Sequence, residues 1–297
     1  MRIRELHTQT GQRGRQGGDV CFGKETPVKK ILFMDLDGTL LKDDKTVSEK
    51  NRMAINKMIA AGHYAVVATG RSVKSGNGVV KSLGLTMPGC YMLAFNGAII
   101  YDCAADCILK ERTIPIEYVE YLFEEAKKYG IHVQTYTRDY LLVQSEDKEL
   151  DYYVKNTQMP YKLVDNVFSD LDSEPWKVLL ASLEEKEKLV RFQQEHRAWE
   201  KGRCSSFFSC QEYLEYCPAG TDKGSGIRAL CDILNLDWEN TYAVGDERND
   251  IPMIKAAKTG IAMKNGVEEV KMAADYITEN DNEHDAIAEV IDKFILI

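Results

Sequence analysis

An alternation of short apolar segments and amphipathic segments runs along this 297-residue chain, breaks in the middle and then resumes. Residues Ile31 to Met34 are apolar without interruption. A helical pattern follows, which Ser48 can cap and Gly62 can end, and a second apolar segment covers residues 65–69. The order of strand, helix and strand is typical of a parallel sheet covered by helices. We therefore expect an α/β protein.

The middle of the chain follows a different pattern. The spacing of apolar residues predicts a helix over residues 116–129 that stops at Gly130, and a hairpin around Arg138 and Asp139. This mixed order indicates an α+β insertion in the α/β domain. Residues 1–27 are polar, rich in Gly, Gln and Arg, and show no periodicity, which predicts disorder. The expected organisation is a disordered N-terminal extension over residues 1–27, a core domain over residues 28–102 and 212–297, and an inserted domain over residues 103–211.

Charge and composition exclude several classes of partner. The formal charge of −9, without clustered Lys and Arg, argues against a nucleic-acid partner. No apolar run is long enough to cross a bilayer, so a membrane partner is not expected either. The eight cysteines form no CxxC pair, which favours free thiols over a zinc site or a disulfide framework. We therefore expect a cytoplasmic protein, and the sequence indicates no oligomeric state.

The strongest chemical signal is DLDGT, residues Asp35 to Thr39, directly after the first apolar segment. The residues that follow parallel strands line the ligand crevice of such sheets, so Asp35 and Asp37 should face a ligand. Adjacent carboxylates repel one another and favour a hard divalent cation such as Mg²⁺. A calcium loop of the EF-hand type needs Gly and Glu where this chain has Leu40 and Thr46, and is excluded. An ordinary Asp-Gly turn remains the alternative.

Two further segments carry groups that can bind phosphate. In ATGR, Thr69 offers a hydroxyl and Gly70 a backbone N–H after the second apolar segment. In GTDKG, Lys223 places a positive charge at the expected start of a helix, where anions are favoured. Taken alone, Thr-Gly after a strand is more often only a turn, and Lys223 is equally compatible with a solvated surface lysine.

A fourth segment, GDERND, follows the apolar segment TYAV near the C-terminal end of the alternation. Asp246 is expected at another strand end, and Asn249 and Asp250 should open the following helix. Acidic residues in a first helical turn are common for stability alone. The four segments together, rather than any one of them, indicate a phosphate and metal site.

DLDGT, ATGR, GTDKG and GDERND, in this order, resemble the four motifs of the haloacid dehalogenase superfamily. The long insertion, NGA at 96–98 and GIAM at 260–263 resemble the Cof-type phosphatases with a C2-class cap. The resemblance covers residues 29–297 and implies a Rossmann-like parallel-sheet core with an inserted α+β C2-type cap domain. The sequence departs from these relatives in having Lys264 in place of the Gly of AMGN, and His284 and Asp285 in place of Asp-Gly.

The resemblance also implies roles for individual residues. Asp35 would attack phosphorus, and Asp37 would act as general acid and base. Mg²⁺ would be held by Asp35, the backbone carbonyl of Asp37 and Asp246. The groups expected to bind the phosphoryl oxygens are Thr69, Lys223, Asn249 and the backbone N–H groups of Leu36 and Gly70, with Glu247 and Asp250 in supporting roles.

The implied function is a Mg²⁺-dependent phosphatase that acts on a small phosphorylated metabolite, such as a sugar phosphate, through an aspartyl-phosphate intermediate. A phosphomutase and a non-hydrolytic phosphate-binding regulatory protein remain as alternatives. The insertion is expected to cover the site and read the leaving group. Four of its residues, Tyr136, Arg138, Trp176 and Lys177, are interpreted as parts of a surface hairpin and of the core of the insertion, outside the site.

Overall fold

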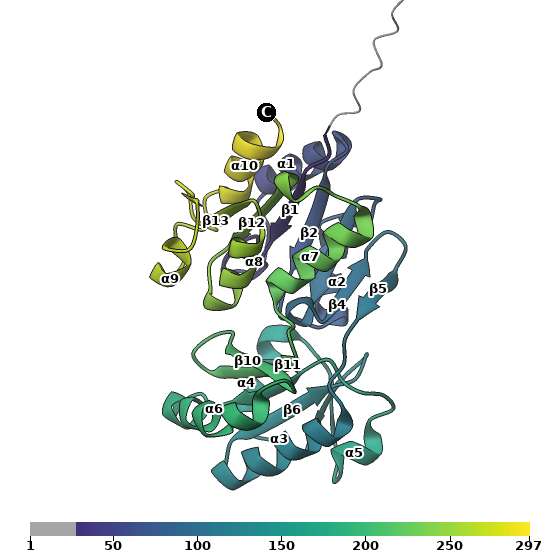
Figure 1. Cartoon of the computed structure of the whole chain (residues 1–297), viewed down its shortest axis with the longest axis vertical. Helices are drawn as coiled ribbons and strands as arrows, with labels where there is room; N and C mark the ends of the chain where they lie inside the picture. Colours follow the sequence, from purple (N-terminus) through teal and green to yellow (C-terminus); the bar gives the residue numbers. More distant parts are fainter. Residues whose placement is uncertain (1–27) are drawn as a thin grey trace, which may run out of the picture.

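The computed structural model describes residues 28–297, so the disorder predicted for residues 1–27 lies outside the described residues. Two sheets divide the described chain into an upper and a lower lobe (Figure 1). Among the described helices, none has the length and apolar character needed to cross a membrane.

The upper lobe is built on a sheet that has eight strands within residues 28–297. These strands are β1 (Ile31–Met34), β2 (Tyr64–Ala68), β3 (Cys90–Ala94), β4 (Ile99–Asp102), β5 (Cys107–Glu111), β12 (Thr241–Gly245), β13 (Thr259–Ala262) and β14 (Tyr276–Ile277). Their order is β14-β13-β12-β1-β2-β3-β4-β5, and the pairs from β14 to β3 are parallel. The α/β parallel-sheet prediction is confirmed, with β4 and β5 added as an antiparallel extension that the sequence analysis did not anticipate.

Helices cover both faces of this sheet (Figure 1). Leu32 and Met34 of β1 face α1 (Glu49–Ala60), α2 (Val73–Ser82) and α10 (Ala286–Val290). Ile31 and Phe33 point to the other face, against α7 (Lys223–Leu234), α8 (Ile251–Ala256) and α9 (Glu268–Lys271). The short helices are η1 (Phe95–Gly97), η2 (Trp238–Asn240), η3 (Arg248–Asp250) and the π-helical η4 (Ile291–Ile295). The predicted helix start at Ser48 is confirmed, because its side chain accepts a hydrogen bond from the N–H of Asn51.

The lower lobe has a second sheet with the order β10-β11-β9-β6-β7-β8. The strands are β6 (His132–Tyr136), β7 (Leu141–Val143), β8 (Tyr161–Leu163), β9 (Val178–Ala181), β10 (Cys204–Phe208) and β11 (Tyr213–Pro218), and the helices are α3 (Ile116–Tyr129), α4 (Lys148–Thr157), α5 (Val167–Asp170) and α6 (Lys186–Glu200). Helices α3, α5 and α6 pack on the face that points away from the upper lobe. The predicted end of α3 at Gly130 is confirmed, and this glycine has a φ of +61°, a left-handed conformation favoured by Gly.

Strand pairing does not support the predicted boundaries of the insertion. Residue 103 falls between β4 and β5, which pair with each other in the upper sheet. Residue 211 falls between β10 and β11, which pair in the lower sheet, where β11 also pairs with β9. The β4–β5 hairpin interrupts the alternation of strands and helices but remains part of the upper sheet. The alternation alone therefore placed the first boundary of the insertion, at residue 103, too early. We call residues 112–218 the cap and the rest of the described chain the core.

One apolar cluster continues from the core into the cap. It contains Leu32 and Met34 of β1 as well as Leu179 and Ala181 of β9. The Phe95 ring of the core stacks on Trp176 of the cap, with centroids 5.7 Å apart and an interplanar angle of 12°. The cap is therefore docked on the core through packed side chains.

The contact between α7 and α8 gives a prediction about stability. A Cβ added at Gly224 would lie 2.3 Å from the carbonyl oxygen of Pro252, so Gly224→Ala must push the two helices apart. Overpacking of this kind costs about 1–3 kcal/mol, which chemical denaturation can measure. In the matched control Gly78→Ala, on α2, the new Cβ meets no atom within 4 Å. This control should be stabilised by up to about 1 kcal/mol, and equal effects of the two changes would contradict the prediction.

Candidate active site

The four motifs lie at the same edge of the upper sheet. Asp35 follows β1, Asp246 follows β12 and Thr69 follows β2. Since β12, β1 and β2 are parallel neighbours, their carboxyl ends lie side by side. The fold thus brings together residues that are separated by up to about two hundred positions in the chain.

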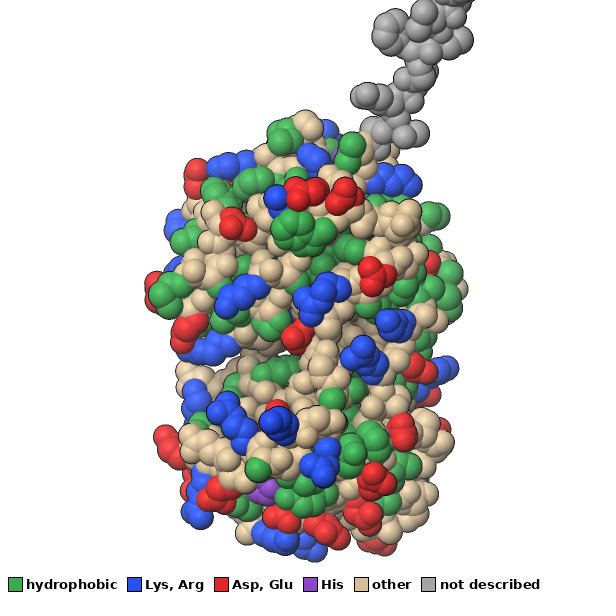
Figure 2. Space-filling view, in the orientation of Figure 1, with side chains coloured by type: hydrophobic (Ala, Val, Ile, Leu, Met, Phe, Trp, Pro, Cys, Tyr) green, Lys and Arg blue, Asp and Glu red, His purple; other side chains and the backbone are tan. Residues whose placement is uncertain are grey.

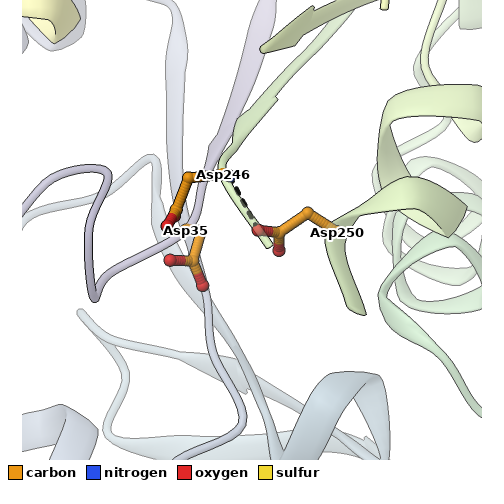
Figure 3. A group of neighbouring side chains, drawn as sticks. All are labelled: Asp35, Asp246 and Asp250. Carbon is orange, nitrogen blue, oxygen red and sulfur yellow. Dashed lines mark hydrogen bonds between the residues drawn. The ribbon is translucent and has the colours of Figure 1, made fainter. Parts of the chain in front are cut away.

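Three carboxylates and one ammonium group form a buried cluster at this edge. One oxygen each of Asp35, Asp246 and Asp250 lies within 4.8 Å of the others. Figure 3 shows Asp35 and Asp246 close together, with Asp250 approaching from the side of the helix. Lys223, at the first turn of α7, has its Nζ 2.5 Å from Oδ1 of Asp35 and 2.5 Å from Oδ1 of Asp250. The Lys223 side chain is fully buried.

The charges in this cluster are unbalanced. Burial raises the pKa of Asp35 to about 7, although Lys223 acts in the opposite direction. Burial and the nearby Asp35 and Asp250 also raise the pKa of Asp246 well above its usual value. Burial alone would lower the pKa of Lys223, but Asp250 and Asp35 raise it overall, so the ammonium group stays charged. One buried cation therefore faces three carboxylates, and further positive charge would stabilise their ionised forms.

The oxygens of Asp250 are already engaged by protein donors. Oδ1 accepts from Lys223, and Oδ2 accepts from the backbone N–H groups of Asp246 and Glu247 at 2.9 and 3.0 Å. Asp250 therefore fixes both the ammonium group and the loop that carries Asp246.

The remaining oxygens suit a hard divalent cation. Asp35 and Asp246 offer carboxylate oxygens at adjacent strand ends, and Thr39 donates to Oδ1 of Asp246 at 2.6 Å, which orients that side chain. An all-oxygen set with excess negative charge fits Mg²⁺ and provides none of the thiolate ligands that soft metals prefer. Asp35 and Asp246 of the predicted metal ligands are thus placed together.

Asp37 has partners that the sequence analysis missed. Arg71 donates to both of its oxygens, from Nε at 2.8 Å and from Nη2 at 2.6 Å, and Lys45 donates from Nζ at 2.9 Å. Burial acts to raise the pKa of Asp37, but Arg71 and then Lys45 lower it overall. Arg71 belongs to the ATGR segment, so its charge beside a phosphate-binding turn was an available signal. Nothing in the sequence around Lys45 indicated this contact.

A cavity of about 360 Å³ lies between the core and the cap and opens onto Asp35 and Asp37. Figure 2 shows a hollow between the two lobes. Thr69, Gly70 and Asn249 also line the cavity, as does Glu247 of the predicted supporting pair. Tyr152, Tyr153, Asn156, Thr157, Lys177, Ser209, Cys210, Tyr213 and Glu215 contribute the cap side of the lining.

The other predicted residues differ in how they lie relative to the cavity. The Leu36 side chain is buried in the apolar core, which leaves its backbone for a ligand.

Among the cap residues interpreted as lying outside the site, Lys177 does line the cavity, so that interpretation was wrong for Lys177. Tyr136 is buried where the cap meets the core, with its ring edge-on to Phe95 of the core, and its hydroxyl donates to the hydroxyl of Tyr153. Arg138 and Trp176 line a separate cavity beside β4 and β5.

The first departure from the Cof-type pattern lies close to the site. Asn265, next to Lys264, donates from Nδ2 to the carbonyl of Gly38 at 2.8 Å and so supports the DLDGT loop. In the second departure, Asp285 has a φ of +65°, a left-handed conformation that Gly adopts without strain and Asp tolerates. The backbone conformation expected of Asp-Gly is therefore kept here by Asp.

The family model for haloacid dehalogenase-like hydrolases matches residues 32–291 of this chain. The chain belongs to this family. Family membership confirms the resemblance read from the four motifs.

Individual relatives agree with this assignment. A 5-amino-6-(5-phospho-D-ribitylamino)uracil phosphatase of Bacillus subtilis, YitU, is 29% identical over 275 residues, which cover 89% of this chain and 97% of that protein. The crystal structure of a haloacid dehalogenase-like hydrolase from Bacteroides thetaiotaomicron superposes with a TM-score of 0.81 at 29% identity, covering 89% of this chain and 99% of that one. The protein TM0651 from Thermotoga maritima gives a TM-score of 0.76 at 29% identity, covering 90% and 97%.

The tight turn at Gly38 gives a prediction about the site. Gly38 has a φ of +81°, and an added Cβ would lie 2.4 Å from Oδ2 of Asp246. We expect Gly38→Ala to lower kcat/KM for a phosphomonoester by about a hundredfold, because displacement of a reacting geometry by about 1 Å costs this much.

Gly62→Ala is the matched control for this change. Gly62 also has a positive φ, of +90°, but its added Cβ meets no atom within 4 Å. Both substitutions should lower the stability to unfolding by about 1 kcal/mol or more, because Ala is strained at positive φ. Gly62→Ala should keep its activity, and equal activity losses in the two variants would contradict the assignment.

Proposed function

We propose that this hydrolase is a Mg²⁺-dependent phosphatase of a small phosphorylated metabolite, with Asp35 as the nucleophile. The observation that carries the proposal is the position of Asp35, which lies in the buried cluster with Lys223 and also lines the cavity between core and cap. A site that only bound phosphate would need no carboxylate at the position of Asp35, because the two anions repel each other.

The chemistry divides hydrolysis into two displacements. A carboxylate oxygen of Asp35 attacks phosphorus, the bond from phosphorus to the leaving oxygen breaks, and Asp37 gives that oxygen a proton. Water then attacks phosphorus, Asp37 accepts its proton, and the bond to Asp35 breaks, which returns the free carboxylate and releases inorganic phosphate.

The ion pair between Asp37 and Arg71 controls when Asp37 is ionised and when it can carry a proton. In the absence of substrate, Arg71 lowers the pKa of Asp37 and keeps it ionised. An incoming phosphate is an anion that competes for the guanidinium group. Withdrawal of Arg71 toward the phosphate removes the larger of the two influences that lower the pKa of Asp37, and Asp37 can then carry the proton that the leaving group needs.

The phosphoryl oxygens lie among donors from each motif. These donors are the Thr69 hydroxyl, the Lys223 ammonium, the Asn249 amide and the backbone N–H groups of Leu36 and Gly70. When bound by Asp35, Asp246 and the backbone carbonyl of Asp37, Mg²⁺ supplies the positive charge that lets an anionic carboxylate approach an anionic phosphate. Asp250 holds Lys223 in place, and Glu247 supports the same edge of the site.

The substrate class follows from the cavity and from the relatives. A cavity of about 360 Å³ lined by hydroxyls, amides and tyrosine rings suits the phosphomonoester of a small polar metabolite. YitU is named for a phosphorylated ribitylamino-uracil, which belongs to this class.

The cysteines of the described chain are free thiols, which supports a reducing compartment, the cytoplasm.

Asp35→Asn tests the nucleophile. We expect release of inorganic phosphate from p-nitrophenyl phosphate in Mg²⁺ to fall to background, since the amide cannot form the acyl phosphate. Asp37→Ala should lower kcat by about 10²–10⁴-fold, the usual effect of removing a general acid and base. Asp232→Asn, on the exposed side of α7, is the matched control and should keep full activity. Retained turnover in Asp35→Asn would remove Asp35 as the nucleophile.

Removal of the metal tests the proposed cofactor. Dialysis against a chelator should abolish activity, and added Mg²⁺ should restore it. In Asp246→Asn, the Mg²⁺ concentration for half-maximal activity should rise by at least about tenfold, because one charged oxygen ligand is lost. The Asp232→Asn control should respond to Mg²⁺ like the unaltered protein. Full activity after chelation would contradict the assignment.

A further inference from the structure

Lys177 is a charged side chain buried at the junction between cap and core. It lies directly before β9 and is only 1% exposed. Its Nζ donates to the carbonyl of Gly70 at 2.8 Å and to Oε1 of Glu215 at 3.1 Å. Burial acts to lower the pKa of Lys177, but Glu215 raises it overall, so the ammonium group is charged. A cap residue thus holds the backbone of the ATGR turn in the core.

Glu215, on β11 of the cap, connects Lys177 to a second part of the core, the turn at Asn96. Oε1 accepts from Lys177 and from the Ser209 hydroxyl at 2.9 Å, and Oε2 accepts from Nδ2 of Asn96 at 2.6 Å. The side chain is 3% exposed. A buried carboxylate with three donors is well satisfied and has a fixed orientation.

The side chain of Asn96 connects Glu215 to Asn249 of the GDERND segment. Its Oδ1 accepts from Nδ2 of Asn249 at 3.2 Å, and its backbone N–H donates to the carbonyl of Thr69 at 2.9 Å. Phe95 and Asn96 both have left-handed backbones, with φ of 48° and 55°, which two successive non-glycine residues seldom adopt. Such a turn persists only where its surroundings determine it, and the bonds from Glu215 and Asn249 do so.

We infer that Lys177 and Glu215 of the cap are positioning residues for phosphoryl binding, because they hold the Gly70 turn and, through Asn96, the amide of Asn249. This inference rests on the proposed function, in which Gly70 and Asn249 bind phosphoryl oxygens. It assigns to the cap a part in binding the group that all substrates of the enzyme share, in addition to any contact with the leaving group.

The double variant Lys177→Met with Glu215→Gln tests the inference. It removes both charges together, so no unpaired charge is left buried. The inhibition constant of inorganic phosphate as product should rise at least about tenfold, and kcat/KM should fall by about 10–100-fold, the usual effect of losing groups that orient ligands. The loss should be equal for p-nitrophenyl phosphate and for a sugar phosphate, because both carry the same phosphoryl group. A loss confined to the sugar phosphate would overturn the positioning role in favour of leaving-group recognition.

A second variant approaches the same network from the core. Asn96→Gly suits the left-handed backbone, keeps the pair of Lys177 and Glu215, and removes the amide that contacts Asn249. It should weaken inhibition by phosphate to a similar degree, and this result tests the connection from Glu215 through Asn96 to Asn249 even where the double variant fails to fold. Unchanged inhibition in Asn96→Gly would overturn the link to Asn249.

The control for general damage is Leu189→Ala, which opens a hole in the outer apolar cluster of the cap, away from the cavity. It should lower the melting temperature and leave the inhibition constant of phosphate unchanged. A rise in that constant in Leu189→Ala would show that loss of cap stability alone explains the effect. Phosphate release by the unaltered protein, abolished in Asp35→Asn, tests the proposed function separately, so failure of either idea can be recognised.

Discussion

The arrangement of the site depends on the enclosure of the Lys223 ammonium group among carboxylates that are themselves removed from water. An isolated buried charge is very costly, so neither the lysine nor the aspartates could remain ionised here alone. Lys223 contacts Asp35 and Asp250 at 2.5 Å each, and this pairing ties the first turn of α7 to the end of β1 and to η3. The same pairing leaves an excess of negative charge, which makes the site receptive to a divalent cation.

Sheet topology explains how distant parts of the chain reach this cluster. The order β12-β1-β2 places three strand ends next to each other, and each is followed by a residue of the site. The helices of the core contribute to the site at their N-terminal ends. Lys223 is the first residue of α7, after the capping residue Asp222, and Asp250 is the N-cap residue of α8.

Much of this site could be predicted from the sequence because its residues stand in short segments at strand ends and at one helix start. Asp35 and Asp246 were identified after apolar strands and Lys223 at the start of a helix, and the three lie together. Contacts between distant segments were out of reach. Nothing in the sequence indicates that Lys45 would meet Asp37, since this contact depends on how the loop after β1 folds back.

In the cap, too, contacts between distant segments were missed in the sequence analysis. Glu215 stands alone as a charge between Leu214 and Tyr216 in an apolar strand, which was a signal of a buried partner that we did not use. Its partner Lys177 was assigned to the interior of the cap, and the structure instead places it in the cavity wall. The pairing of β4 with β3 and β5 places this hairpin in the upper sheet, and the sequence pattern of a hairpin cannot show which sheet it joins.

The two connections between core and cap run next to each other. Arg112, where the chain enters the cap, donates from Nη1 to the carbonyl of Ala219, where the chain returns, at 3.3 Å. A segment whose ends meet can be lengthened, shortened or replaced without changing the order of the strands that flank it. The chemistry at the ends of β1, β2 and β12 can therefore be retained through evolution while the inserted module diversifies, so that one hydrolytic framework can serve many metabolites.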